Sequence, residues 1–182
     1  MVQHHVVFIT TRRQPFDAMK PAITSPPIVT HRGFVSPIHL EPTGQMTLPF
    51  QLARCEEASW QLLARLGCGP RALQREQRGV LALEQSMTHH ALLHTAALLH
   101  VESELLEIGS RGLRCRHRLC DTEAQRALST MDVLLGLVSL GQRTLLEVPR
   151  ELMWRAQSAF PNAVVRAPSH EVAGGVIAAV PT

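Results

Sequence analysis

Four histidines lie close together in the stretch 86–104, which reads SMTHHALLHTAALLHVESE. His90 and His94 are four residues apart, so on a helix both side chains would point the same way and could hold one metal ion. A zinc site needs about three or four ligands, and no third ligand is evident near this pair. The glutamate of the HExxH motif is replaced by Ala91. We therefore expect no metal and no cofactor, with His90 and His94 as the candidate ligands if a metal is bound.

Two cysteines flank the basic stretch CRHRLC, at positions 115 and 120. Their Cys-x4-Cys spacing differs from the Cys-x2-Cys spacing of most zinc modules. The neighbouring arginines would lower the pKa of a nearby thiol, which favours reactivity as much as metal binding. The same arginines could grip a phosphate, but aromatic residues that would stack on single-stranded bases are absent. We interpret residues 109–120 as a loop that contains two ordinary cysteines, with the solvated, arginine-rich part at 111–118.

The segment SWQLLARLGCGPRALQREQRG, residues 59–79, carries the sharpest motif in the chain. One helix would end near Gly67, and Pro70 suits the first turn of a second helix. This is the layout of a helix-turn-helix, in which the second helix enters the major groove of DNA. The side chains that could then reach base edges are Arg71, Gln74, Arg75 and Arg78.

Two pieces of this segment, LARLG (63–67) and RALQR (71–75), resemble the DNA-binding unit of the AraC family of regulators. The resemblance implies sequence-specific DNA binding through the second helix. It is confined to residues 59–79, and the second unit that such regulators usually carry is absent from the sequence. An ordinary helical hairpin with an exposed Arg/Gln face is the alternative interpretation.

The elements that must position these residues are predicted to be helical. Apolar residues at three- and four-residue steps favour helices over about 50–66, 71–108, 121–145 and 149–160. Prolines interrupt the N-terminal region every few residues. The expected fold class is therefore all-α: a small bundle of three to four helices (49–161) between a Pro-rich, extended or partly disordered arm (1–48) and a mobile tail (162–182).

The composition excludes several classes of protein. The chain has 182 residues, 45% of them hydrophobic, and a formal net charge of +3, which suits one domain with a real core. No apolar run approaches the roughly 18 residues of a membrane span, and the N-terminus lacks the pattern of an export signal. Neither a Gly-rich phosphate loop nor a Gly-x-Ser-x-Gly motif is present. We therefore expect a cytoplasmic protein that is not an enzyme.

The leading hypothesis is a soluble helical module that works by contact, as an adaptor, chaperone-like protein or assembly factor. Its apolar helical faces are wider than a thin bundle can bury, so a protein partner or self-association would cover them. The expected interaction face consists of Leu92, Leu93, Leu98, Leu99 and Leu106. The alternative is a helix-turn-helix regulator that binds nucleic acid through residues 60–79. A metal-dependent enzyme and a helical coat of storage granules are the remaining hypotheses.

Overall fold

The structure, a computed structural model, describes residues 27–91 and 97–166. Its strands are β1 (Ile28–Val35), β2 (Arg78–His89), β3 (Ala97–Gly109), β4 (Gly112–Asp121), β5 (Arg126–Ser139), β6 (Leu145–Leu146) and β7 (Val164–Val165). Its helices are the short 3-10 helix η1 (Pro37–His39), α1 (Leu48–Arg65), α2 (Pro70–Arg75) and α3 (Arg150–Ala159). The prediction of an all-α bundle is therefore wrong.

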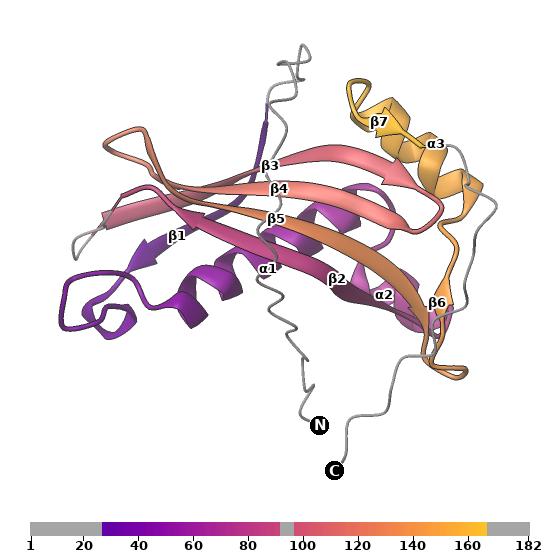
Figure 1. Ribbon diagram of the computed structural model, residues 1–182, viewed down its shortest axis with the longest axis horizontal. Helices are drawn as coiled ribbons and strands as arrows, with labels where there is room; N and C mark the ends of the chain where they lie inside the picture. The colour runs from indigo at the N-terminus through magenta and orange to yellow at the C-terminus, as the bar shows by residue number, and fades with distance from the viewer. Residues whose placement is uncertain (1–26, 92–96, 167–182) are drawn as a thin grey trace.

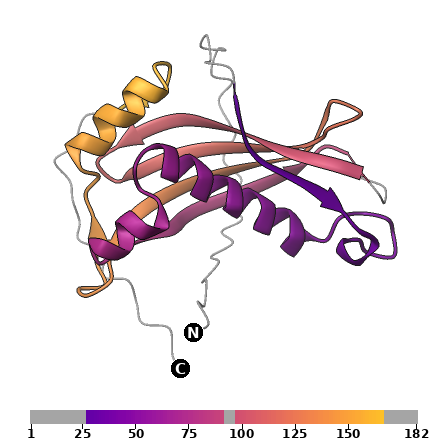
Figure 2. The ribbon, with the colours of Figure 1, turned by 180° about the vertical axis from the view of Figure 1, so that it is seen from behind.

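One sheet contains the seven strands of the described residues. Its main order is β1-β3-β4-β5-β2, with β6 beside β5 and β7 beside β3. Neighbours along the main order are antiparallel. The long helix α1 lies along one face of the sheet, and the described helices leave the other face uncovered (Figures 1 and 2). The fold is thus a curved, mostly antiparallel sheet packed around one central helix, with only the short β7 of the described strands running parallel to its neighbour β3.

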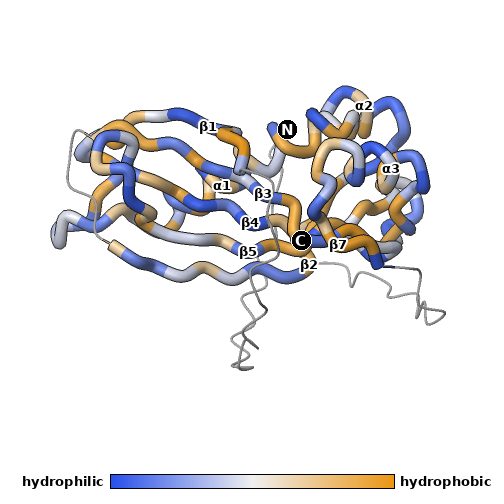
Figure 3. The backbone as a smooth tube through the Cα atoms, turned by 90° about the horizontal axis from the view of Figure 1, so that it is seen from above, coloured by the Kyte–Doolittle hydropathy of each residue, from blue (hydrophilic) through white to orange (hydrophobic). Residues whose placement is uncertain are grey.

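β4 shows the two-residue alternation of a half-buried strand most clearly. Leu113, Cys115, His117 and Leu119 are buried, whereas the arginines between them are partly exposed. Hydrophobic and hydrophilic residues alternate in the same way along the neighbouring strands (Figure 3). The stretch 111–118 is therefore mostly a central strand of the sheet, and its interpretation as a solvated loop is wrong.

A β-bulge in β3 explains why the sequence there resembles a helix. The pairing of β3 with β4 changes register between Leu105 and Glu107. Because of this extra residue, Leu105 and Ile108 are both buried although they are three residues apart. Val101, also buried, lies four residues before Leu105. The last four-three steps of the pattern that predicted a helix over 71–108 thus come from a bulged strand, and the helix expected over 121–145 is replaced mainly by β5.

α1 is the helix that the sequence predicts over residues 50–66, and α3 lies within the one predicted over 149–160. The buried side of α1 consists of Gln51, Cys55, Ala58, Ser59, Leu62 and Leu63. Two apolar clusters pack between α1 and the sheet, one containing Leu62, Leu105 and Cys115 and the other containing Ala58, Val101 and Leu119. In β3 and β4, the inward positions between these clusters are polar.

The predicted arm, residues 1–48, contains β1 and η1, and β1 pairs with β3 over its length. Residues 1–26 of this arm and residues 167–182 of the predicted tail lie outside the described residues. Of the described helices, none combines the length and the apolar character that crossing a membrane would require.

Candidate active site

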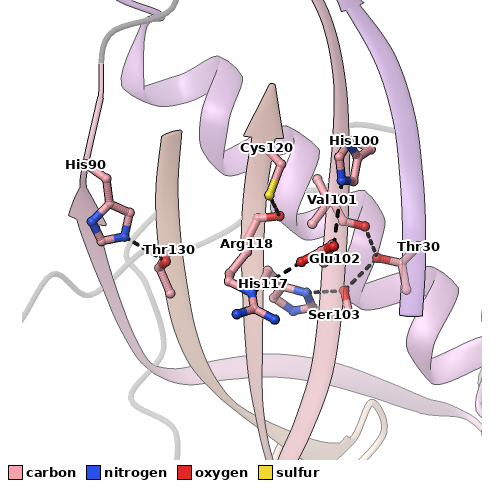
Figure 4. A network of polar contacts seen from close by, with 10 residues as sticks. All are labelled: Thr30, His90, His100, Val101, Glu102, Ser103, His117, Arg118, Cys120 and Thr130. Carbon is pink, nitrogen blue, oxygen red and sulfur yellow. Dashed lines mark hydrogen bonds and ion pairs between the residues drawn. The ribbon is translucent and has the colours of Figure 1, made fainter. Parts of the chain in front are cut away.

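A row of four polar side chains crosses from the sheet to the buried side of α1. Thr30 Oγ1 on β1 lies 2.6 Å from Ser103 Oγ on β3, and Ser103 Oγ lies 2.7 Å from Nδ1 of His117 on β4. His117 Nε2 lies 2.9 Å from Ser59 Oγ on α1. Figure 4 shows Thr30, Ser103 and His117 joined in this order. This buried row separates the two apolar clusters.

Burial determines the protonation of this row. The His117 side chain is completely buried, which lowers its pKa to about 4 against the opposing charge of Asp132, so the imidazole is neutral at pH 7. A serine beside a neutral histidine is the arrangement that activates a nucleophile. Here, however, a serine replaces the carboxylate as the third partner, and Ser59 is only 6% exposed. We therefore assign the buried row to fixing α1 on the sheet.

The other polar cluster of α1 centres on the carboxylate of Glu57. Glu57 Oε2 lies 3.1 Å from His31 Nδ1, and Glu57 Oε1 lies 2.8 Å from Arg54 Nη2. The Glu57 side chain is 46% exposed, whereas that of His31 is 15% exposed. The carboxylate is thus both fixed in orientation and accessible to water.

His31 is poorly placed to act as the base itself. Its Nε2 is buried without a hydrogen-bond partner and faces Gly33, where an added Cβ would lie 2.9 Å away. Burial lowers the pKa of His31, the Glu57 charge opposes this effect, and Arg54 adds to it. A neutral ring that donates its Nδ1–H to Glu57 fits these surroundings. His31 therefore positions Glu57, and the carboxylate is the group that can take a proton from water.

An exposed carboxylate lies in the segment before α1, and an aromatic pair joins this segment to the first turn of α1. Glu41 lies exposed in the turn between η1 and α1. The rings of His39 and Phe50 stack with their centroids 3.9 Å apart, and the Arg54 guanidinium lies 5.1 Å from the centroid of Phe50. Phe50, Arg54 and Glu57 follow one another along a single face of α1. We call His31, Arg54 and Glu57 the Glu57 cluster.

The uncovered face of the sheet carries paired charges and offers no comparable site. Arg116 donates two hydrogen bonds to the Asp132 carboxylate, at 2.7 and 2.8 Å. Arg118 lies 3.4 Å from a Glu102 oxygen (Figure 4). Because the opposite charges on neighbouring strands neutralise one another, we interpret this face as a solvated surface.

The histidines of the stretch 86–104 are not gathered on one helix. His90 follows β2, and its Nε2 lies 2.8 Å from Thr130 Oγ1, whereas His100 on β3 contacts Thr122 Oγ1 at 2.9 Å. His94 lies outside the described residues. Within 27–91 and 97–166, no group of three or more His, Cys, Asp or Glu side chains could hold a metal ion. The shared helical face assumed for His90 and His94 is wrong, because His90 follows a strand.

The residues predicted to read DNA do not form a recognition helix. Arg71, Gln74 and Arg75 are exposed on α2, but this helix has only six residues. Arg78 already belongs to β2 and pairs with Glu76 at 2.7 Å. A six-residue helix that ends where the edge strand β2 begins cannot lie along the major groove as the motif requires.

The leucines of the expected interaction face are divided by the strand geometry. Leu99 is 1% exposed in the core, whereas its neighbour Leu98 is 49% exposed, because successive residues of β3 point to opposite faces. Leu106 is partly buried. Leu92 and Leu93 lie outside the described residues. The described members therefore form no common helical face.

Sequence reasoning missed His31, Glu57, Ser59 and His117. The alternation of arginine with other residues in RCRHRL, 114–119, is the signal that could have placed His117 on the inner face of a strand. The contact between His31 and Glu57 has no comparable local signal, because it joins an edge strand to a helix.

The sequence matches the family model of the thioesterase-like superfamily over residues 36–164, which is more than half of the chain. This segment includes α1 and all strands except β1 and the end of β7. No curated protein matches the sequence.

Solved structures share the fold at low sequence identity. A hypothetical protein from Staphylococcus aureus, solved in complex with CoA, has a TM-score of 0.68 and 13% identity, with 86% of this chain and 98% of that chain covered. A 1,4-dihydroxy-2-naphthoyl-CoA thioesterase from Synechocystis has a TM-score of 0.60 and 16% identity, with coverages of 70% and 93%. For a protein from Lactobacillus plantarum described as an oleoyl thioesterase, the TM-score is 0.66, the identity 12% and the coverages 80% and 55%. The chain thus spans about half the length of that protein.

These findings correct the functional predictions made from the sequence. The adaptor and granule-coat hypotheses assumed a helical bundle, and the regulator hypothesis assumed an AraC-like unit that the family match does not support. The prediction that the chain is not an enzyme is wrong as well, because the family that the sequence matches is the thioesterase-like superfamily. The chain belongs to the thioesterase-like superfamily.

Proposed function

We propose that the protein hydrolyses an acyl thioester, with the Glu57 carboxylate as the general base. The observation that carries this proposal is the half-exposed carboxylate on the central helix, held 3.1 Å from His31 Nδ1. Family membership supports the reaction class, and the acyl-CoA thioesterase among the similar structures supports a thioester substrate.

In this reaction, Glu57 takes a proton from a water molecule whose oxygen attacks the thioester carbonyl carbon. The tetrahedral intermediate then collapses as the carbon–sulfur bond breaks. The proton held by Glu57 passes to the departing sulfur, so the products are a carboxylic acid and a thiol. His31 and Arg54 each hold one carboxylate oxygen, which leaves a second lone pair on each oxygen for the water.

The test measures the hydrolysis of acyl-CoA substrates of increasing chain length. The release of the free thiol is monitored as the signal of hydrolysis. Glu57→Gln keeps the size of the side chain but removes its basicity, so kcat should fall by about 100-fold or more. Glu123→Gln, an exposed carboxylate on the β4–β5 turn, serves as the matched control and should keep the wild-type rate. His31→Gln should give an intermediate loss, because it removes the positioning of Glu57.

Glu41→Gln tests whether the exposed carboxylate before α1, rather than Glu57, is the base. If Glu41→Gln abolishes turnover and Glu57→Gln does not, thioester hydrolysis stands but Glu57 is not its base. If the wild type hydrolyses none of the thioesters at millimolar concentration, the proposed function itself is refuted.

We also propose that the protein self-associates through β2. This strand pairs with β5 on one side, and no described strand pairs with its other side over its 12 residues. A long open edge is a template for a strand of another chain, and two copies of β2 could pair about a two-fold axis. Light scattering should give twice the monomer mass, whereas a monomer at every concentration would contradict the pairing.

A further inference from the structure

α3 lies beside the C-terminal end of α1 (Figures 1 and 2), and residues of both helices line one hollow. Leu152 and Ala156 on the buried side of α3 are 4% and 0% exposed, but Trp154 is 71% exposed. Trp154 borders an open hollow of about 610 Å³, a size typical of small-molecule sites. The hollow is lined by Ala64, Arg65, Leu66, Gly67, Trp154, Arg155, Ser158 and Ala159. We call it the α1–α3 hollow.

Two arginines give the α1–α3 hollow a positive charge. Arg65 is exposed in the last turn of α1, and Arg155 projects from α3. An added Cβ at Gly67 would collide with Nη1 of Arg155, so the glycine of this turn leaves the space that the guanidinium occupies. Arg155 also pairs with Glu151, one turn earlier on α3. Since none of the lining residues is acidic, the hollow combines an aromatic face with planar groups suited to phosphate.

We propose that the α1–α3 hollow binds the 3′-phospho-ADP portion of coenzyme A, with adenine on Trp154 and phosphates at Arg65 and Arg155. An exposed tryptophan offers a face on which a flat aromatic ring such as adenine can stack, and guanidinium groups bind phosphate in a bidentate manner. This inference rests on the proposed function, because it names the thiol carrier of the same thioester.

The exposed face of α1 connects the hollow to Glu57. Gln61, Ala64 and Arg65 follow Glu57 at four, seven and eight residues, so they share one side of the helix, and all three are exposed. Eight helical residues correspond to about 12 Å along the axis. An extended pantetheine arm covers this distance, so a nucleotide in the hollow would place the thioester carbonyl near Glu57.

Binding is measured first, without turnover. Free coenzyme A and adenosine 3′,5′-bisphosphate are titrated by calorimetry and by tryptophan fluorescence. The wild type should bind both ligands, and Trp154→Ala and Arg65→Gln should each weaken binding about tenfold or more. Arg71→Gln removes an exposed arginine outside the hollow and should bind like the wild type. Equal affinity of all four proteins would overturn the inference, whether or not the protein hydrolyses thioesters.

Measurements of turnover then test the proposed nucleotide site independently of the proposal that Glu57 is the general base. With acyl-CoA, Trp154→Ala should raise KM about tenfold and keep kcat within about twofold of the wild type. With the same acyl group on N-acetylcysteamine, which has no nucleotide, the variant should equal the wild type. If Glu57→Gln abolishes hydrolysis but Trp154→Ala affects both substrates equally, the catalytic proposal stands and the nucleotide site does not. The nucleotide-site inference would also be overturned if Trp154→Ala changed KM only for acyl groups attached to an acidic carrier protein.

Discussion

Protonation of His117 should make the stability of the fold depend on pH between about 6.5 and 4. Burial lowers the pKa of this side chain to about 4 in the folded protein, compared with the ordinary value of 6.5 in an unfolded chain. Over this interval, the unfolded chain binds a proton that the folded chain does not. The stability contributed by the neutral ring is therefore fully present above about pH 6.5 and is lost as the pH falls through 4.

The size of the effect follows from the pKa difference. The two values, 6.5 and about 4, differ by about 2.5 units. At about 1.36 kcal/mol per unit, protonation lowers the free energy of unfolding by about 3 kcal/mol. Urea unfolding at several pH values between 7.5 and 4, at constant ionic strength, measures this loss directly.

His117→Met removes the titrating group and keeps most of its volume. Ser59 retains a hydrogen bond to the Cys55 carbonyl at 3.1 Å, and Ser103 retains its contact with Thr30. The variant should be less stable at pH 7, but its free energy of unfolding should fall by about 3 kcal/mol less between pH 7 and 4 than that of the wild type. His90→Gln changes an exposed histidine and should keep the wild-type slope. A His117→Met curve parallel to the wild-type curve would refute the reasoning.

Two further predictions concern the core and a strand turn. Burial raises the pKa of Cys55 and Cys115 to about 12 each, so a thiol reagent at pH 8 should modify these two cysteines only when the protein unfolds. The partly exposed Cys68 should react first in the folded protein. Peptide mass spectrometry measures the order in which the cysteines are modified. Gly112→Ala places a Cβ against the main-chain oxygen of Leu135 and should cost about 3 kcal/mol in chemical unfolding, whereas Gly141→Ala, with open space around it, should change stability by less than about 0.5 kcal/mol.

The helices could be predicted because their signals are local. Pro49 and Pro70 lie in the first turns of α1 and α2, and Pro149 caps α3. Gly67 takes a positive φ of 83° just after α1 ends, where glycine is favoured. Each of these boundaries depends on residues within a few positions of the helix end, so a single sequence is enough to locate it.

The strands were missed because their residue types favour helices and because their bulges produce a spacing of apolar residues that resembles that of a helix. β3 and β4 are rich in leucine, glutamate and arginine, which favour helices when they are considered locally. Bulges at Leu105–Glu107 in β3 and at Ala82–Glu84 in β2 interrupt the two-residue alternation. Only cross-strand pairing reveals their true arrangement, such as Arg116 between Glu104 and Asp132, and this pairing is not visible along the sequence.

The Glu57 cluster could not be predicted for a related reason. Glu57 is one of several charged residues on a correctly predicted helix, and nothing in its own neighbourhood distinguishes it from Glu56. What distinguishes it is His31, which belongs to a segment that reads as an irregular arm because of its prolines. The arm contains the edge strand β1, and its pairing with β3 brings His31 to α1.

A bulge in β1 links the buried row to the Glu57 cluster. Successive residues of a regular strand point to opposite faces, so Thr30 and His31 should not both face α1. The register of β1 against β3 shifts between Val29 and His31, and Thr30 is the extra residue. As a result, Thr30 joins the buried row through Ser103, while its neighbour His31 reaches Glu57 on the same side of the sheet. The row that fixes α1 on the sheet and the histidine that orients the carboxylate therefore depend on the same local irregularity, which also explains why a regular strand pattern is absent from this part of the sequence.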